Sequence, residues 1–176
     1  TLSPSSAASD VYKRQVYLLA DDIFDEMVSR NVGEYRYPLG GKLYVFNKNE
    51  NIGFIKGHMC SPAIATQAED LIAGGVKELI HVGYAGGLQP ELVPGEIILT
   101  DGAFNDTAVA RLYGYDYDII HSSKDLTNEI EEMITSAEIL YKRGFHWTTD
   151  AGYRETWGQV MDYRDKGALC VEMEGV

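Results

Sequence analysis

The chain has 176 residues, with 15 Lys and Arg against 27 Asp and Glu, giving a formal net charge of −12 at pH 7. Such an acidic surface repels nucleic-acid phosphates and argues against a nucleic-acid partner, although a small anionic ligand responds to the local field of its site. Hydrophobic residues make up 45% of the chain, enough for a packed core, and no apolar run is long enough to span a membrane.

The first fifteen residues do not resemble natural protein sequence. Residues 5–15, "SSAASDVYKRQ", match the translation of a common transposase sequencing adapter. We therefore interpret residues 1–15 as a non-native leader and residues 16–176 as one partial domain, either natural end of which can be missing. A disordered Ser/Ala-rich leader is the alternative. Cys60 and Cys170 have no metal-ligand spacing, so we expect reduced, buried thiols of a cytoplasmic protein and no bound metal.

Apolar periodicity and turn residues predict the secondary structure along the chain. A Ser-Pro pair at Ser61 predicts a helix start with Ser61 as the N-cap, and Gly74 with Gly75 predicts its end. Strands that alternate with helices indicate an α/β class, a layered αβα domain with a central mixed sheet. The expected elements are a helix at 16–30, a hairpin of strands 43–47 and 52–56, the helix from Ser61, buried strand 78–82, strand 96–100, a loop at 113–124, a helix at 126–138, strand 140–149, a helix at 155–165 and strand 168–174.

A glycine-rich turn, "HVGYAGGLQP", follows the predicted strand 78–82. Glycines after a buried strand let backbone N–H groups approach an anion or a polar ligand closely. The spacing G-x-x-G-G is not the G-x-G-x-x-G fingerprint of dinucleotide-binding proteins. The turn therefore has two readings at this point, a ligand-binding turn or a purely structural one.

The sequence ends in "ALCVEMEGV", an apolar run followed by two glutamates. Alternation along a strand places Glu172 and Glu174 on one face and Met173 on the other. Two carboxylates on one face are costly to bury without hydrogen-bond donors, which ribose hydroxyls would supply. The alternative is a strand that simply emerges into water.

Four segments occur together in a recognisable order: "GHMCSPAIATQAEDL", "VKELIHVGYAGGLQPELVPGEIIL", "TTDAGYRET" and "GALCVEMEG". They resemble the motifs of the nucleoside phosphorylase/nucleosidase superfamily, nearest its uridine phosphorylase-like branch. The resemblance covers roughly residue 43 to the end. It implies the fold of that family, C-terminally incomplete here because relatives continue with a helix after E-M-E.

The resemblance also implies roles for individual residues. The second glutamate of E-M-E binds the ribose hydroxyls and the methionine lies against the sugar, which implies these roles for Glu174 and Met173, with Glu172 beside them. The turn contributes phosphate and base contacts. The residues matched to the turn are His81, Gly83, Tyr84, Ala85 and Gly86, and those matched to the base-holding segment are Tyr153 and Arg154.

Several positions depart from the family pattern. His81 stands where the phosphorylases commonly place an Arg for phosphate. An imidazole can donate to phosphate, but it cannot bind it in the bidentate way of a guanidinium. Tyr84 stands where a Thr or Ser is usual, and Gly152 where a Phe stacks on the base. The family has an N-terminal phosphate loop with glycine and aspartate, and the segment "LADDIF" has the acidic residues of this loop but not its glycine. The region that supplies the general acid for purines in the family lies beyond E-M-E.

These motifs predict a glycosyltransferase, a nucleoside phosphorylase that uses inorganic phosphate as co-substrate and gives free base and ribose 1-phosphate in nucleotide salvage. No metal or organic cofactor is expected, and a homo-oligomer is implied for the full-length protein. The alternatives are a nucleosidase that uses water, favoured by the loss of the Arg at position 81, a non-catalytic nucleoside-binding protein, and an unrelated α/β domain.

Overall fold

The computed structural model describes residues 15–30, 33–36, 43–46 and 49–176. Residues 1–14 of the predicted leader and residues 47–48 of the predicted hairpin turn lie outside the described residues. The chain divides into two compact units, Thr1–Tyr84 and Ala85–Val176, and each is described by itself.

The first unit contains one five-stranded mixed sheet with the strand order β2-β3-β4-β1-β5. Strand β1 is central and runs parallel to both β4 and β5, whereas β2, β3 and β4 form an antiparallel meander. Its elements are β1 (Gln15–Leu19), α1 (Asp21–Ser29), β2 (Gly33–Arg36), β3 (Leu43–Phe46), β4 (Asn49–Lys56), α2 (Ser61–Ala73) and β5 (Glu78–Val82).

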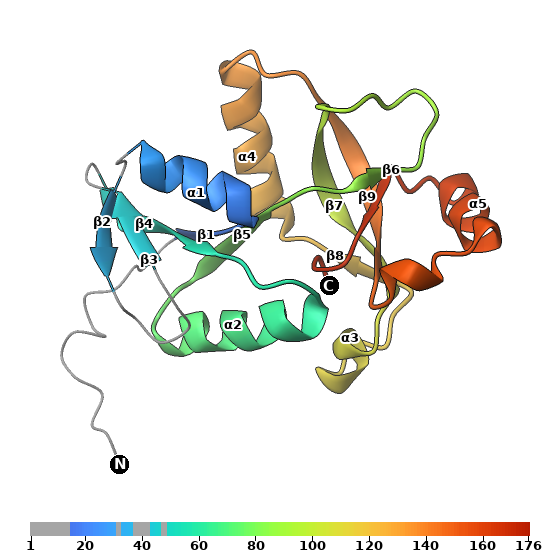
Figure 1. Cartoon of the computed structure of the whole chain (residues 1–176), viewed down its shortest axis with the longest axis horizontal. Helices are drawn as coiled ribbons and strands as arrows, with labels where there is room; N and C mark the ends of the chain where they lie inside the picture. The colour runs from blue at the N-terminus through green and yellow to red at the C-terminus, as the bar shows by residue number, and fades with distance from the viewer. Residues whose placement is uncertain (1–14, 31–32, 37–42, 47–48) are drawn as a thin grey trace. The chain divides into compact units, whose positions relative to one another are not determined.

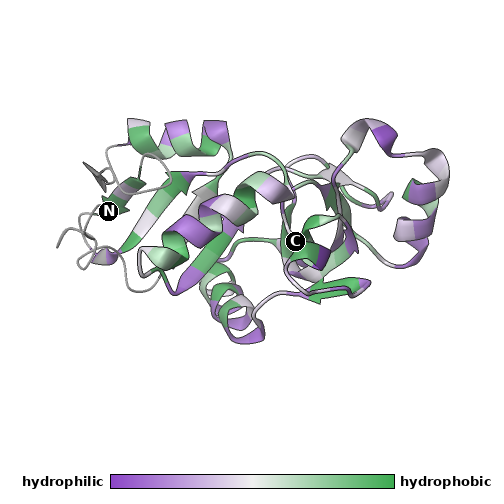
Figure 2. Ribbon diagram, turned by 90° about the horizontal axis from the view of Figure 1, so that it is seen from below, coloured by the Kyte–Doolittle hydropathy of each residue, from purple (hydrophilic) through white to green (hydrophobic). Residues whose placement is uncertain are grey.

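Helices α1 and α2 cover opposite faces of this sheet, as Figure 1 shows. Alternate residues of each strand serve the two faces. Leu43 and Val45 of β3 belong to the core under α2, whereas Tyr44 and Phe46 pack with Phe54 and the residues of α1. Figure 2 shows hydrophilic and hydrophobic residues side by side along the helices, as expected when one helix face is buried. The first unit therefore has the predicted αβα layering.

Two local predictions in this unit are wrong. Residues 16–19 form strand β1 instead of the start of a helix, because they pair with β4 on one side and β5 on the other. The helix begins only at Asp21, with Ala20 as its N-cap. The N-cap of α2 is Cys60, not Ser61, and Cys60 has a positive φ of 73°. Gly74 ends α2 as predicted.

The second unit contains another five-stranded mixed sheet, with the order β6-β10-β9-β7-β8. Strands β7, β9 and β10 are parallel, and the short edge strands β6 and β8 are antiparallel to their neighbours. Its elements are β6 (Gly86–Gly87), β7 (Ile97–Asp106), α3 (Val109–Leu112), β8 (Ile119–His121), α4 (Lys124–Ser136), β9 (Tyr141–Thr149), the 3-10 helix η2 (Gly152–Arg154), α5 (Trp157–Asp165) and β10 (Cys170–Glu172).

A fully buried Trp147 anchors the core of the second unit. Its indole stacks on Tyr163 of α5 with ring centroids 4.4 Å apart, and it packs with Ala168 and Val171. Helix α5 begins with a capping box in which Thr156 and Gln159 satisfy each other's backbone N–H groups. The α5 face of β9 and β10 is therefore the apolar face.

Helix α4 is held to the sheet by charge. The guanidinium of Arg143 on β9 donates to Asp101 of β7 at 2.6 Å, to Asn128 at 3.0 Å and to Glu131 of α4. The Asp101 and Glu131 carboxylates raise the pKa of Arg143, the hydrogen bond to Asp101 contributing most. This network fixes α4 over the β7–β9 pair, near the start of β9.

The predicted α/β class with mixed parallel and antiparallel pairing is confirmed, although the described strands fall into two sheets. Strand 78–82 is half-exposed instead of buried, the loop 113–124 includes the short strand β8, and the strand predicted at 168–174 ends at Glu172. Cys170 is buried as expected, but Cys60 is only half-buried. No helix within the described ranges is long and apolar enough to cross a membrane.

Candidate functional site

Strands β9 and β10 present a polar cluster on the face opposite α5. In their parallel pairing Val171 lies opposite Trp147 and Glu172 opposite Thr148. Because side chains alternate along a strand, His146 and Thr148 share the face that Trp147 does not occupy. His146 is 5% exposed, Thr148 is fully buried and the Glu172 side chain is 11% exposed. Three polar side chains are therefore held out of water at the end of the sheet.

The carboxylate of Glu172 is engaged at both oxygens. The Thr148 hydroxyl donates to Oε1, and Nε2 of His146 lies 3.2 Å from the same oxygen. The backbone N–H of Glu174 donates to Oε2 at 2.8 Å. The His146 contact has the length but not the direction of a hydrogen bond, since neither ring nitrogen has a well-aligned partner among the described residues.

These contacts keep the buried carboxylate ionised. Burial alone would raise the pKa of Glu172, but the contacts with His146, the Thr148 hydroxyl and the Glu174 N–H outweigh it and lower the pKa below its ordinary value. The sequence suggested that a sugar would supply the donors that Glu172 needs. In the structure the chain supplies them itself.

Glu174 is in a different environment from Glu172. Strand β10 ends at Glu172, so the alternation that would place both glutamates on one face does not continue to Glu174. The Glu174 side chain is half-buried, and its carboxylate accepts from the N–H of Met173 at 3.2 Å. Gly175 follows so closely that a methyl group there would collide with Nε2 of His146 and lie 3.0 Å from Oε1 of Glu172.

The second half of the glycine-rich turn lies against the strand that leads into E-M-E. Gly86 pairs with Val171, and Gly87 with Cys170, in a short antiparallel ladder. A Cβ at Gly86 would lie 3.3 Å from Cγ1 of Val171, so the backbones approach closely there. Ala85 and Gly86 are exposed. Within the second unit, the structure therefore brings together part of the turn and the beginning of E-M-E.

The first half of the turn belongs to the first unit. His81 is exposed at the end of β5, and its ring lies beside Gly83, whose Cβ would be 3.4 Å from Cε1 of His81. Tyr84 is 68% exposed, and its hydrogen bond to the Asp22 carboxylate raises its pKa. Because β1 and β5 are parallel neighbours, the residues that follow them meet at one edge of the sheet. The acids of "LADDIF" therefore lie beside the turn.

The segment matched to base binding forms the 3-10 helix η2. Tyr153 is fully exposed and Arg154 is exposed. Gly152 lies against Met173, because a Cβ at Gly152 would be 3.3 Å from the Met173 sulfur. The structure thus brings the start of this segment to the middle residue of E-M-E, while the roles of Tyr153 and Arg154 stay predictions.

Sequence reasoning did not single out His146 and Thr148. Their signal was present, because "HWTT" places polar residues at alternate positions in a strand whose last four residues are buried. Polar side chains at buried positions need partners, so such a pattern predicts a buried polar cluster.

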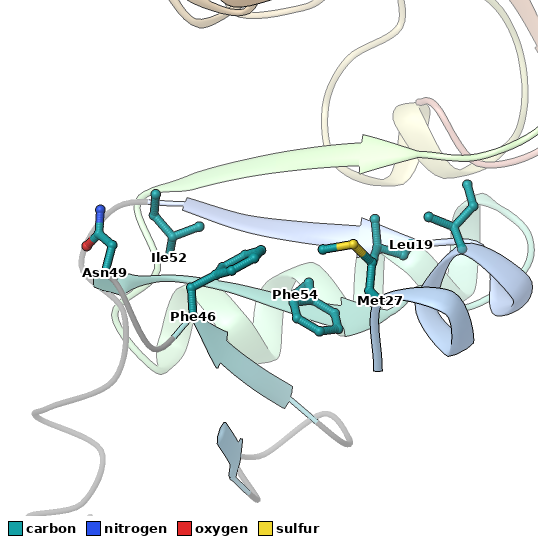
Figure 3. Close-up of a pocket in the computed structure, with 7 residues that line it drawn as sticks. Leu19, Met27, Phe46, Asn49, Ile52 and Phe54 are labelled. Atoms are coloured by element: carbon teal, nitrogen blue, oxygen red, sulfur yellow. The ribbon is translucent and has the colours of Figure 1, made fainter. Parts of the chain in front are cut away.

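Each unit also has a hollow, and neither hollow is lined by residues of the polar cluster. An apolar cavity of about 430 Å³ in the first unit lies between α1 and the sheet, and of its lining residues only Asn49 has a polar side chain (Figure 3). A polar hollow of about 330 Å³ in the second unit is lined by Asp106, Asp116 and Asp118 with Arg111. Among the residues that the structure describes, no group of three His, Cys, Asp or Glu side chains is arranged to hold a metal ion.

Relatives of the chain carry the name purine nucleoside phosphorylase. It is 28% identical over 159 residues to a purine nucleoside phosphorylase DeoD-type of Exiguobacterium sibiricum, covering 89% of this chain and 66% of that protein. It is 31% identical over 115 residues to the corresponding protein of Bacillus cytotoxicus, covering 64% of this chain and 49% of that protein. The chain thus spans between about half and two thirds of the length of these relatives.

The fold has solved counterparts. A uridine phosphorylase from Vibrio fischeri, crystallised with 6-hydroxy-1-naphthoic acid, superposes with a TM-score of 0.81 at 22% identity, covering 96% of this chain and 71% of that one. At that identity the likeness shows the fold alone. The model of the phosphorylase superfamily matches residues 19–176, which is nearly all of the described sequence. The chain therefore belongs to the phosphorylase superfamily.

Proposed function

We propose that this chain acts as a nucleoside phosphorylase, an enzyme that cleaves the N-glycosidic bond of a nucleoside with inorganic phosphate. The products are the free base and ribose 1-phosphate. Family membership supports the proposal, as do the purine nucleoside phosphorylase names of the relatives. No metal or organic cofactor enters the reaction, because positioned dipoles and charges can stabilise the oxocarbenium-like state. We further propose a cytoplasmic homo-oligomer.

The observation that carries the proposal is the arrangement of E-M-E. Glu172 is buried and engaged at both oxygens, so it has little capacity left for a ligand. Glu174 is half-buried just beyond the strand, and its backbone is fixed by Glu172. A carboxylate held in this way can accept two vicinal hydroxyl donors and so orient a ribose ring. The sugar would then lie against Met173, which also touches Gly152.

The experiment uses the 176-residue chain with uridine and with inosine, each with and without phosphate. Calorimetry measures binding, and chromatography measures base release and ribose 1-phosphate. We expect base release that requires phosphate, and the preferred nucleoside identifies the base. Glu174→Gln removes the charge and should weaken ribonucleoside binding roughly 10- to 150-fold, the range of a hydrogen bond to a charged group.

A matched control is Glu132→Gln, an exposed position on α4 that should leave binding unchanged. Failure of the wild-type chain to bind either nucleoside, or equal affinity of Glu174→Gln and wild type, would refute the proposal. Binding without base release would support a non-catalytic nucleoside-binding protein instead.

One observation favours a second candidate, a nucleosidase. His81, exposed at the end of β5, stands where the phosphorylases commonly place an arginine for phosphate. A single imidazole holds phosphate less firmly than a guanidinium fork. Base release that is independent of phosphate would identify this activity, and His81→Arg would then be expected to increase the response to phosphate.

A further inference from the structure

His146 is a buried histidine that no motif of the chain explains. It lies on β9 one position from the core residue Trp147, but on the opposite face. Burial of an imidazole is costly unless its nitrogens are used. Nε2 lies 3.2 Å from Glu172 Oε1, and Nδ1 has no hydrogen-bond partner among the described residues. The geometry thus directs one edge of the ring at the first glutamate of E-M-E.

A chain of contacts leads from His146 to the glutamate expected to bind the sugar. His146 and Thr148 approach Oε1 of Glu172, and the other oxygen of Glu172 accepts the Glu174 backbone N–H at 2.8 Å. The orientation of one carboxylate therefore decides where the Glu174 main chain lies. Gly175 packs directly against the His146 ring, and only a residue without a side chain fits there.

We propose that His146 is a positioning residue: its imidazole, with Nε2 3.2 Å from Oε1, steadies the Glu172 carboxylate, which in turn fixes Glu174 for the ribose hydroxyls. The last step rests on the proposed function, whereas the effect on the Glu174 backbone does not. Without His146, the contacts of the Glu172 carboxylate are the Thr148 hydroxyl at Oε1 and the Glu174 N–H at Oε2. Loss of the imidazole should therefore loosen the Glu172 side chain and with it the Glu174 amide.

The test compares three variants of the full chain. His146→Gln keeps an N–H donor at a reach similar to that of Nε2, whereas His146→Leu removes it. His58→Leu, an exposed position in the first unit, is the matched control. The first readout is independent of any activity: the amide-proton shift and hydrogen exchange of Glu174, measured by NMR on labelled protein. We expect exchange to rise about tenfold or more in His146→Leu and to stay near wild type in His146→Gln and in the control.

The second readout is the ratio of affinities for a ribonucleoside and its 2′-deoxy analogue. If His146 places Glu174, this ratio should fall about tenfold in His146→Leu and recover in His146→Gln, because only the ribonucleoside presents both hydroxyls. General destabilisation would weaken both ligands alike. If His146→Leu does not fold, His146→Asn replaces it, since its shorter amide does not reach Oε1.

An unchanged Glu174 amide in His146→Leu, or a His146→Gln protein that behaves like His146→Leu, would overturn the inference. A perturbed Glu174 amide in a chain that binds no nucleoside even as wild type would support the positioning role and refute the proposed function instead.

Discussion

Replacement of Trp147 by alanine tests whether the core of the second unit is organised around this side chain. Trp147 is fully buried and stacked on Tyr163. A buried indole removes about 150–250 Å² from water, worth about 4–6 kcal/mol at 25 cal/mol per Å². Measured Trp→Ala changes in cores cost about 3–5 kcal/mol, so we take about 4 kcal/mol. A unit of this length is stable by about 5–14 kcal/mol, and the loss is therefore a large fraction of the whole.

The assay is urea unfolding of the full chain, followed by far-UV circular dichroism. With a slope of about 1.5 kcal/mol per M, a loss of about 4 kcal/mol should lower the midpoint of the second unit by about 2.7 M. The chain provides a matched control in Trp157, which is 77% exposed at the start of α5. Trp157→Ala should cost less than about 0.5 kcal/mol.

A third variant separates packing from polarity. The indole Nε1 of Trp147 is buried and has no hydrogen-bond partner among the described residues. Trp147→Phe keeps a ring against Tyr163 and removes this unsatisfied donor. It should therefore cost less than Trp147→Ala, about 1–2 kcal/mol of the free energy of unfolding. If Trp147→Ala were no more destabilising than Trp157→Ala, the second unit would not depend on this stack and the reasoning would be refuted.

Three further predictions concern a thiol, a carboxylate and two glycines. Burial, with the Glu172 charge, raises the pKa of the Cys170 thiol to about 11. A thiol reagent near pH 8 should therefore modify the half-buried Cys60 first and react with Cys170 only after urea is added. Equal reaction rates of the two cysteines would contradict this prediction. Because the pKa of Glu172 is lowered in the folded chain, its ionised form adds stability above the ordinary pKa of 4.5, and this stability is lost as the pH falls through the pKa of the folded state. The melting temperature of wild type should therefore exceed that of Glu172→Gln by less at pH 3 than at pH 5. A difference that stays constant would refute the lowered pKa of Glu172. Gly102 has φ of 150° and a methyl group there would overlap a β8 carbonyl, so Gly102→Ala should cost about 1–3 kcal/mol in urea unfolding, whereas Gly158→Ala in α5, with open space around it, should be neutral or stabilising.

Elements with strong local signals could be predicted from the sequence. The hairpin of β3 and β4, the glycine end of α2 and the amphipathic helix α4 all follow from residues next to one another. The apolar spacing of residues 16–19 continues into α1 and therefore predicts a helix there. They form a strand because they pair with β4 and β5, which lie more than 30 residues further along the sequence. A local sequence pattern cannot predict such pairing.

The candidate site likewise has features that the sequence predicts and features that depend on residues far apart in the sequence. The motif E-M-E and the glycine turn are recognisable in the sequence, and in the structure Gly86 of the turn pairs with Val171 of the closing strand. The donors of Glu172 could not be predicted from the motif, because Thr148 and His146 come from β9, more than 20 residues earlier. Alternation along a single strand gave both glutamates one face, but the strand ends between them.

The tight fit between Gly175 and the His146 ring has an evolutionary consequence. A relative that keeps a histidine at this strand position can accept nothing larger than glycine after its second glutamate, whereas a short side chain on the strand removes the most severe overlap, that with Nε2, and leaves the 3.0 Å approach to Oε1 of Glu172. The two positions, nearly thirty residues apart, should therefore co-vary across the superfamily. Homologues with a bulky residue at both would need a different path for the chain beyond the acidic motif.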